Sequence, residues 1–247
     1  MIHATGLEKR FGTKVVVKGI DLRVEPGEVV GLLGPNGAGK TTTLRMLSTT
    51  LLPTAGKATI AGYDVVREPE KVRASIGVLP TDPGLYGRLT AAENLRFYGK
   101  LNGMHGSQLE KRIDELLEQF GLKEVKNERT DTFSKGMKQK VALARCILHD
   151  PPVLILDEPT AGLDVLASRG VIHFISEARR QGRAILFSSH YMLEAERVCD
   201  KVAIIGDGRI LASGSIDKVC RQANASTLED AFIALAYGES AAAGVAQ

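Results

Sequence analysis

The 247-residue sequence has no apolar run long enough to cross a membrane. Its longest apolar stretches, such as Val29–Leu33 and Val153–Leu156, are the length of single strands, whereas a membrane-spanning helix needs about 20 consecutive apolar residues. The first residues also lack the charged-then-apolar pattern of a secretory signal. We therefore expect a protein that neither spans a membrane nor is exported.

Cysteine, tryptophan and excess charge are also scarce. Tryptophan is absent, and the three cysteines (Cys146, Cys199 and Cys220) have no CxxC spacing, so we expect buried, reduced thiols and no metal site. Lys+Arg number 32 and Asp+Glu 29, and a net charge of +3 does not indicate a nucleic-acid-binding surface. The 44% hydrophobic and 25% charged residues are typical of a folded globular protein.

Hydrophobic patterns predict an α/β protein with a helical insertion of roughly sixty to seventy residues. The expected strands are 15–17, 20–24, 29–33, 75–79, 153–156, 184–188, 202–205 and 210–212. The expected helices are 41–52 and 166–180 outside the insertion and, within it, one starting at the capping box Thr90–Glu93, one ending near Gly121, and 134–148. The small, polar residues 240–247 are predicted to be frayed.

A glycine-rich segment between a predicted strand and a predicted helix matches G-x-x-x-x-G-K-[ST]. It consists of Gly34, Pro35, Asn36, Gly37, Ala38, Gly39, Lys40 and Thr41, with Thr42 next in the helix. The glycines let backbone amides converge on a phosphate, and the helix dipole favours the same anion. Lys40 would reach the β- and γ-phosphates, and Thr41 would coordinate Mg²⁺. The alternative is an accidental glycine turn, which the strand and helix on either side make improbable.

Two carboxylates follow a second apolar strand. Asp157 and Glu158 come directly after Val153–Leu156, and a strand that ends beside the phosphate loop would bring Asp157 near Mg²⁺ and Glu158 near the attacking water. Alone, paired acids after a strand are as often a solvated loop. Coupled to the phosphate loop, they favour a nucleotide-hydrolysing site.

Further segments resemble motifs of the ABC (ATP-binding cassette) ATPases. Phe133–Lys140 resembles a variant of their Leu-Ser-Gly-Gly-Gln signature, Asp157–Asp164 their Walker B and D-loop, and Ser188–His190 their switch histidine. Phe11 stands where these proteins stack an aromatic ring on adenine. The resemblance covers about residues 2–215, with five motifs in family order.

The resemblance implies a P-loop NTPase fold: a RecA-like core, an N-terminal antiparallel β subdomain and an inserted α-helical subdomain over about 83–150. It implies one ATPase domain over 1–222, followed by a short helical extension and frayed tail over 223–247. It also implies ATP and Mg²⁺ as ligands, with Glu158 and His190 as catalytic residues. Ser134, Gly136 and Asp164 are expected to contact ATP bound to a second cassette, in a homodimer or heterodimer.

One position departs from the family pattern. The Q-loop glutamine, which touches Mg²⁺ and faces the membrane partner, should follow Ile76–Pro80, but the chain has Thr81 and then Asp82 there. A hydroxyl or a carboxylate at this position could still reach the metal, and we assign Thr81 to the metal site together with Thr41 and Asp157.

The amino-acid sequences of these motifs resemble those of the ATP-binding subunits of ABC-2-type exporters, and most of all those of the sodium-extruding (NatA-type) branch. This implies export, with Na⁺ as the candidate cargo, through separately encoded integral membrane permease subunits, by an ATPase held peripherally at the cytoplasmic side of the membrane. Drug, lipid and polysaccharide exporters share most of these motif sequences and stay as alternatives. A cassette protein acting on ribosomes or DNA is a further alternative, but those resemble fused cassettes or carry long coiled coils, and nucleic acid is not an expected partner.

Overall fold

The structure is a computed structural model that describes residues 1–238. Its centre is a six-stranded sheet with strand order β10-β9-β3-β8-β7-β6, in which all strands except β10 are parallel. These strands are β3 (Val29–Leu33), β6 (Ile76–Leu79), β7 (Val153–Asp157), β8 (Ala184–Ser189), β9 (Lys201–Gly206) and β10 (Arg209–Gly214). The predicted α/β class is confirmed, and the predicted strands agree with the observed ones within about two residues.

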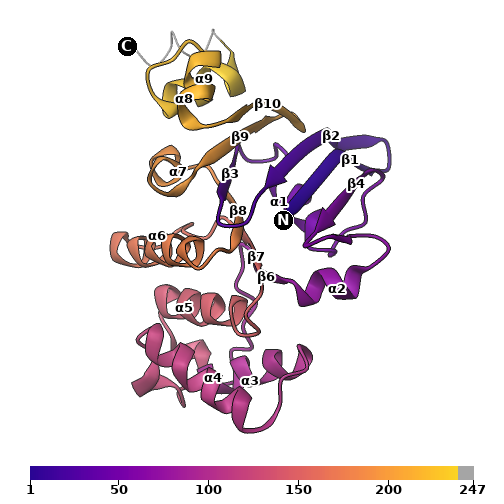
Figure 1. Cartoon of the computed structure of the whole chain (residues 1–247). Coiled ribbons are helices and arrows are strands. Elements are labelled where there is room, and N and C mark those ends of the chain that lie inside the picture. The colour runs from indigo at the N-terminus through magenta and orange to yellow at the C-terminus, as the bar shows by residue number, and fades with distance from the viewer. Residues whose placement is uncertain (239–247) are drawn as a thin grey trace.

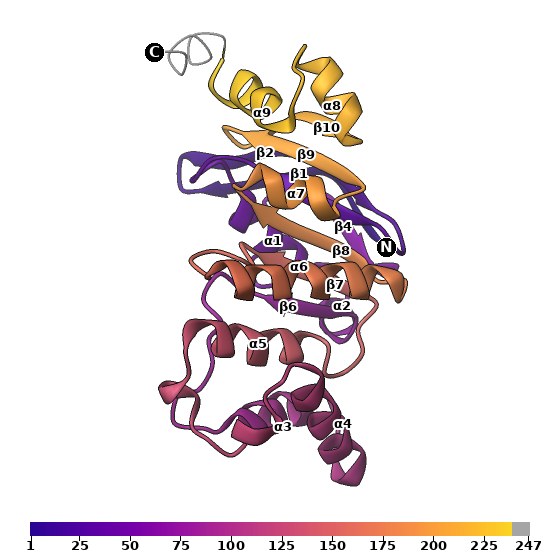
Figure 2. The same ribbon diagram turned by 90° about the vertical axis from the view of Figure 1, so that its left-hand side faces the viewer.

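Both faces of this sheet are covered. Alternate residues of β3 point to opposite sides, so Val30 and Leu32 join one apolar cluster whereas Val29 and Leu33 join the other. The first cluster lies between the sheet, α1 (Lys40–Leu47) and a second, antiparallel sheet. The second cluster lies under the helices of the opposite face, which Figures 1 and 2 show as a separate layer. This double burial explains why β3 and β7 are continuously apolar.

The second sheet is formed by the N-terminal part of the chain, in the order β2-β1-β4-β5. Its strands are β1 (Ile2–Phe11), β2 (Lys14–Val24), β4 (Ala55–Ile60) and β5 (Tyr63–Asp64). The predicted break between strands 15–17 and 20–24 is wrong, because β2 is continuous. Gly19 has a φ of +75° and is skipped in the pairing with β1, so a bulge absorbs the residue that interrupts the sequence pattern.

The remaining helices fall into two groups. Outside the insertion they are α2 (Pro69–Ala74), α6 (Val165–Arg180), α7 (Met192–Val198), α8 (Ile216–Gln222) and α9 (Leu228–Tyr237). The helix predicted over 41–52 is α1, which ends at Leu47 and is shorter than expected. Thr49 has a φ of +62°, and the amides of Thr50 and Leu51 both donate to Arg45 O, so the chain turns back over the helix end.

The helical insertion lies between β6 and β7, at the end of the molecule farthest from α8 and α9 in Figure 1. It contains α3 (Ala91–Leu101), α4 (Gly106–Gln119), α5 (Lys135–Cys146) and the 3-10 turns Lys123–Val125 and Thr130–Thr132. The predicted capping box is confirmed, with Glu93 N donating to Thr90 Oγ1 and Thr90 N donating to the Glu93 carboxylate. Gly121, with a φ of +66°, follows the end of α4 as expected.

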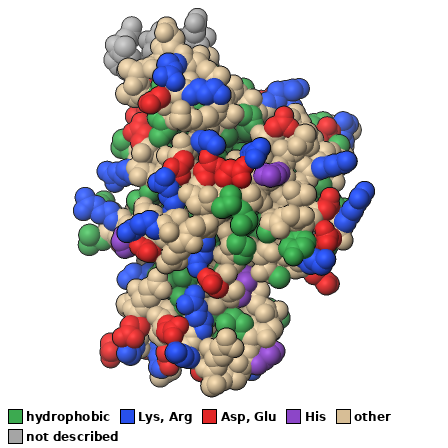
Figure 3. All heavy atoms as spheres, viewed as in Figure 1, with side chains coloured by type: hydrophobic (Ala, Val, Ile, Leu, Met, Phe, Trp, Pro, Cys, Tyr) green, Lys and Arg blue, Asp and Glu red, His purple; other side chains and the backbone are tan. Residues whose placement is uncertain are grey.

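Three expectations from composition meet the structure in different ways. All three cysteines are free, but only Cys146 is fully buried, where burial raises the pKa of its thiol to about 12; Cys199 and Cys220 are half-buried, so the expectation of three buried thiols is corrected. Within residues 1–238 no helix combines the length and apolarity needed to cross a membrane. Basic and acidic side chains interleave over the face in Figure 3. The predicted frayed end, 240–247, lies outside the described residues.

Candidate functional site

The glycine-rich segment forms the turn between β3 and α1. Gly37 and Gly39 have φ angles of +82° and +108°, which residues with a side chain rarely adopt. A Cβ on Gly34 would stand 2.4 Å from Ile205 O, so the loop also packs too closely against β9 for any other residue there. No side chain caps α1, which leaves its first amides free to bind an anion.

Lys40 is the first residue of α1, and its side chain is 6% exposed. Its Nζ donates to Gly34 O at 2.7 Å and lies 3.2 Å from Glu158 Oε1. The other carboxylate oxygen of Glu158 lies 2.7 Å from His190 Nδ1. Glu158 therefore lies between a cation and an imidazole, and the structure brings together three residues that the sequence predicted separately.

Three hydroxyl groups form hydrogen bonds with the carboxylate of Asp157, the last residue of β7. Thr41 Oγ1 lies 3.2 Å from Asp157 Oδ1, and Thr81 Oγ1 lies 2.9 Å from Oδ2. Ser188 Oγ lies 2.6 Å from Oδ1. A carboxylate with hydroxyls around it is an all-oxygen donor set, which suits a hard cation such as Mg²⁺. The residues predicted for the metal, Thr41, Asp157 and Thr81, therefore lie together and fit the ion chemically.

A cavity of about 500 Å³ lies beside the phosphate loop. Its lining residues are Lys14, Val16, Pro35, Asn36, Gly37, Gly39, Lys40, Thr41, Thr42, Thr81, Glu158, Ala161 and His190. Lys14, the first residue of β2, belongs to none of the motifs that indicate this site. Phe11 is 49% exposed and lines a neighbouring cavity of about 610 Å³ that also reaches Thr81 and Asp157.

The residues predicted to face a second cassette, from the signature and the D-loop, lie elsewhere, at the N-termini of α5 and α6. Ser134 Oγ accepts the amide of Met137, and Asp164 Oδ1 accepts the amide of Ala167, so each residue caps its helix. A Cβ on Gly136 would lie 3.3 Å from Ala167 Cβ, which shows how closely the two helix starts approach. None of Ser134, Gly136 and Asp164 lines the phosphate-loop cavity.

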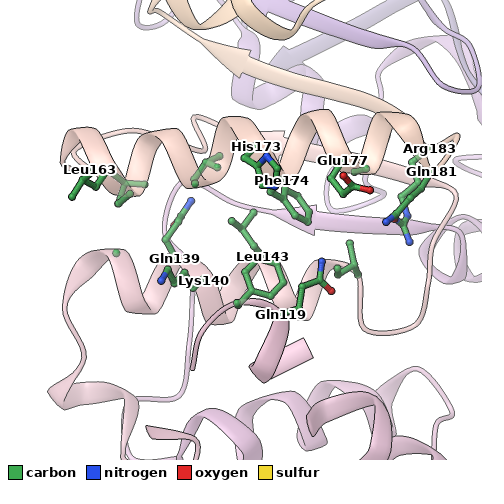
Figure 4. Close-up of a pocket in the computed structure, with 18 residues that line it drawn as sticks. Gln119, Gln139, Lys140, Leu143, Leu163, His173, Phe174, Glu177, Gln181 and Arg183 are labelled. Carbon is green, nitrogen blue, oxygen red and sulfur yellow. The ribbon is translucent and has the colours of Figure 1, made fainter. Parts of the chain in front are cut away.

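A separate cavity of about 280 Å³ lies between α5 and α6 (Figure 4), and Gly136 is among the residues that line it. Leu143 of α5 and Phe174 of α6 contribute apolar side chains to its lining. Gln139, on α5, donates to Pro159 O and ties the signature helix to the segment just after Glu158. No sequence pattern indicates this contact, because only the tertiary fold brings Gln139 and Pro159 together.

Known proteins resemble this chain in sequence and in fold. The family described as "ABC transporter" matches residues 17–161. The ABC transporter ATP-binding protein NatA of Bacillus subtilis is 42% identical over 238 residues, covering 94% of this chain and 97% of that protein. A solved ATP-binding subunit of an ABC transporter aligns with a TM-score of 0.88 and 34% identity, covering 95% of this chain and 99% of that one.

A second solved structure is a dimeric ATP-binding cassette in a post-hydrolysis state, bound to ADP and Pi. It aligns with a TM-score of 0.79 and 25% identity, over 87% of this chain and 98% of that one.

Proposed function

The chain belongs to the ABC transporter family as an ATP-binding subunit and ATPase, and we propose that it powers export through separately encoded membrane subunits, with Na⁺ as cargo. The observation that carries the mechanism is the cavity in which Lys40, Glu158 and His190 meet the phosphate loop. Similarity to the sodium-extruding branch supports the direction and the cargo. We take residues 1–222 as one ATPase domain with its helical subdomain over about 83–150, and 223–247 as an extension.

The proposed binding role belongs to the loop 34–39, Lys40 and Thr42. Loop amides and the start of α1 hold the phosphates, and Lys40 supplies the main countercharge. Thr41, Asp157 and Thr81 would hold Mg²⁺, which when bound neutralises charge on the β- and γ-phosphates. Phe11, exposed at the end of β1, would stack on the adenine.

The proposed hydrolytic role belongs to Glu158. Its carboxylate would accept a proton from the attacking water and orient that water toward the γ-phosphate. His190 Nδ1, 2.7 Å from Oε2, holds the carboxylate in place from one side, and Lys40 Nζ, 3.2 Å from Oε1, holds it from the other. Phosphates that attract Lys40 would weaken its pairing with Glu158 and leave that carboxylate free to take the proton.

Dimerisation is proposed because the site is divided. Ser134, Gly136 and Asp164 do not line the phosphate-loop cavity of their own chain, which supports a role for them toward a nucleotide held by another cassette. The N-terminus of α5 carries Lys135 and no acidic residue in its first turn, which suits an incoming phosphate. The second cassette would be an identical or a related chain.

Exposed aromatic residues offer a surface for the membrane partner. Tyr86 is 49% exposed and packs edge-on against Phe97, at 5.1 Å between ring centroids. Leu101, 67% exposed, lies at the end of the same helix, α3. The segment that carries Tyr86 begins a few residues after Thr81. A permease that moved this surface would therefore also move the Thr81 hydroxyl, which we assign to the metal site. The chain would then be peripheral, at the cytoplasmic side of the membrane.

Purification through an affinity tag from detergent-solubilised membranes tests this function. We expect a protein with several membrane spans to co-purify, and ATP-dependent Na⁺ movement when the complex is placed in vesicles. Movement of a drug, lipid or polysaccharide instead would replace the cargo and keep the motor. Recovery only with ribosomes or DNA would contradict the transport function.

A further inference from the structure

Ser188 stands between the two acids of the site. It is fully buried in β8, and parallel pairing with β7 sets it directly beside Asp157. Its Oγ lies 2.6 Å from Asp157 Oδ1 and 2.9 Å from the backbone nitrogen of Glu158. An amide can only donate, so the hydroxyl accepts from Glu158 and gives its own proton to the Asp157 carboxylate. The Ser188 hydroxyl thus makes hydrogen bonds to two consecutive residues: it donates to the side chain of Asp157 and accepts from the backbone of Glu158.

The backbone at Glu158 needs such support. Its φ is +50°, in the left-handed region that is unfavourable for a residue with a Cβ. Strand β7 ends at Asp157, so no strand pairing extends to the amide of Glu158. The Ser188 side chain takes the place of that missing partner. Without it, a part-buried amide would lose its acceptor at a residue whose backbone conformation is already unfavourable.

We propose that Ser188 is a positioning residue for ATP hydrolysis, which fixes the Asp157 carboxylate and the Glu158 backbone through a single hydroxyl. The proposal rests on the functions proposed above for Asp157 and Glu158. An apolar residue would suit the buried strand equally well, since Leu186 and Phe187 precede it and are fully buried. The neighbouring hydroxyl of Ser189 is also buried but accepts the amide of Tyr191, away from both acids.

Ser188→Ala tests the proposal. We expect kcat to fall by about 10- to 100-fold, less than the full contribution of a general base, because Glu158 is present but misplaced. ADP binding, measured by calorimetry without metal, should keep its affinity within about twofold. The increase in ADP affinity that Mg²⁺ provides should shrink by about tenfold, the lower end of the loss seen when a hydrogen bond that orients a metal ligand is removed. Ser188→Thr, which keeps the hydroxyl, should recover most of both properties.

The control is Thr130→Val, which removes another fully buried hydroxyl, one that bonds Tyr86 O in the helical insertion. It should keep kcat within about twofold, whatever it does to the melting temperature. If Ser188→Ala fails to fold, Ser188→Cys carries the same expectation, because a thiol keeps the volume but is a weak donor and acceptor.

Two results would overturn the proposal: a Ser188→Ala enzyme with near-normal kcat and an intact Mg²⁺ effect, or a Ser188→Thr enzyme as defective as the alanine variant. Glu158→Gln is assayed in parallel to separate the causes. If Glu158→Gln stalls hydrolysis and Ser188→Ala does not, only the inference about Ser188 fails. If Glu158→Gln is fully active, the proposed catalytic function itself fails.

Discussion

The lysine side chains of the phosphate-loop region and those at the N-terminus of α5 differ in their burial and in whether a carboxylate pairs with them. In the first region Lys40 is almost fully buried and has a carboxylate partner, Glu158, in its own chain. In the second region Lys138 Nζ reaches only the backbone oxygen of Asp131 and Lys135 extends over Gly162, so neither ammonium group meets a carboxylate within residues 1–238. A cation with an internal partner belongs to a site the chain completes alone. Lysine side chains that have no carboxylate partner are what we expect at a surface to which an anion from another molecule binds.

The largest effect is expected from Glu158→Gln, which tests the phosphate-loop region. Removing the general base should lower kcat by at least about 100-fold. ATP affinity should be kept or increased, because Lys40 loses the carboxylate that competes with phosphate for it. Steady-state hydrolysis and equilibrium ATP binding check the two parts, with Glu177→Gln on α6 as the matched control. Full turnover by the Glu158 variant would remove that residue from its proposed role.

Lys40→Ala should have the next largest effect, and it tests ATP binding in the same phosphate-loop region. The phosphates lose a charged hydrogen-bond donor, which is worth about 1.5–3 kcal/mol, so ATP should bind about 10- to 100-fold more weakly. Calorimetric titration with ATP measures this directly. An unchanged ATP affinity would count against the phosphate-loop assignment.

Gly136→Asp tests the N-terminus of α5. A carboxylate at the start of α5 would repel an incoming phosphate, so hydrolysis should fall by about tenfold or more while ATP binding to the single chain stays within about twofold. Gly170→Asp makes the same change on α6, at a position where a Cβ meets nothing within 4 Å, and should leave both properties nearly unchanged. Equal losses in the two variants would refute a special role for the signature helix.

The smallest effect concerns the junction between the helical insertion and the central sheet. His149 follows α5, its Nε2 lies 3.1 Å from Ile76 O on β6, and burial lowers its pKa. A lowered folded-state pKa means that the unfolded chain binds the proton more readily, so this contribution to stability is present above the unfolded-state pKa near 6.5 and is lost as pH falls below it.

His149→Gln should therefore flatten the loss of unfolding free energy between about pH 7.5 and about pH 5.5, and cost about 1 kcal/mol at the upper end through the hydrogen bond to Ile76. Urea unfolding at the two pH values measures both quantities. A pH dependence identical to that of the unaltered protein would show that His149 does not titrate with folding.

Sequence patterns predicted the parts of this molecule that depend on neighbours in the chain. The strand–loop–helix around Lys40, the capping box at Thr90 and the start of the helix near Ser134 are local features, and sequence patterns predict each of them. The buried strand before Asp157 was predicted for the same reason, since burial on both faces removes all polar residues from it.

Contacts that depend on register and tertiary packing could not be predicted. Ser188 meets Asp157 only because β7 and β8 pair in one particular register, and no sequence pattern specifies it. Gln139 reaches Pro159 through the packing of α5 against the loop after β7. The early end of α1 depends on the left-handed conformation of Thr49, a residue whose type gives no turn signal.

The mass of the Glu158→Gln protein with saturating ATP and Mg²⁺ tests the divided site most directly. Light scattering after size exclusion should give twice the chain mass of 26.5 kDa with ATP, and the single mass without nucleotide or when Gly136→Asp is added. A protein that binds ATP yet keeps the single mass throughout would contradict the proposal that the N-terminus of α5 in one cassette completes the nucleotide site of another.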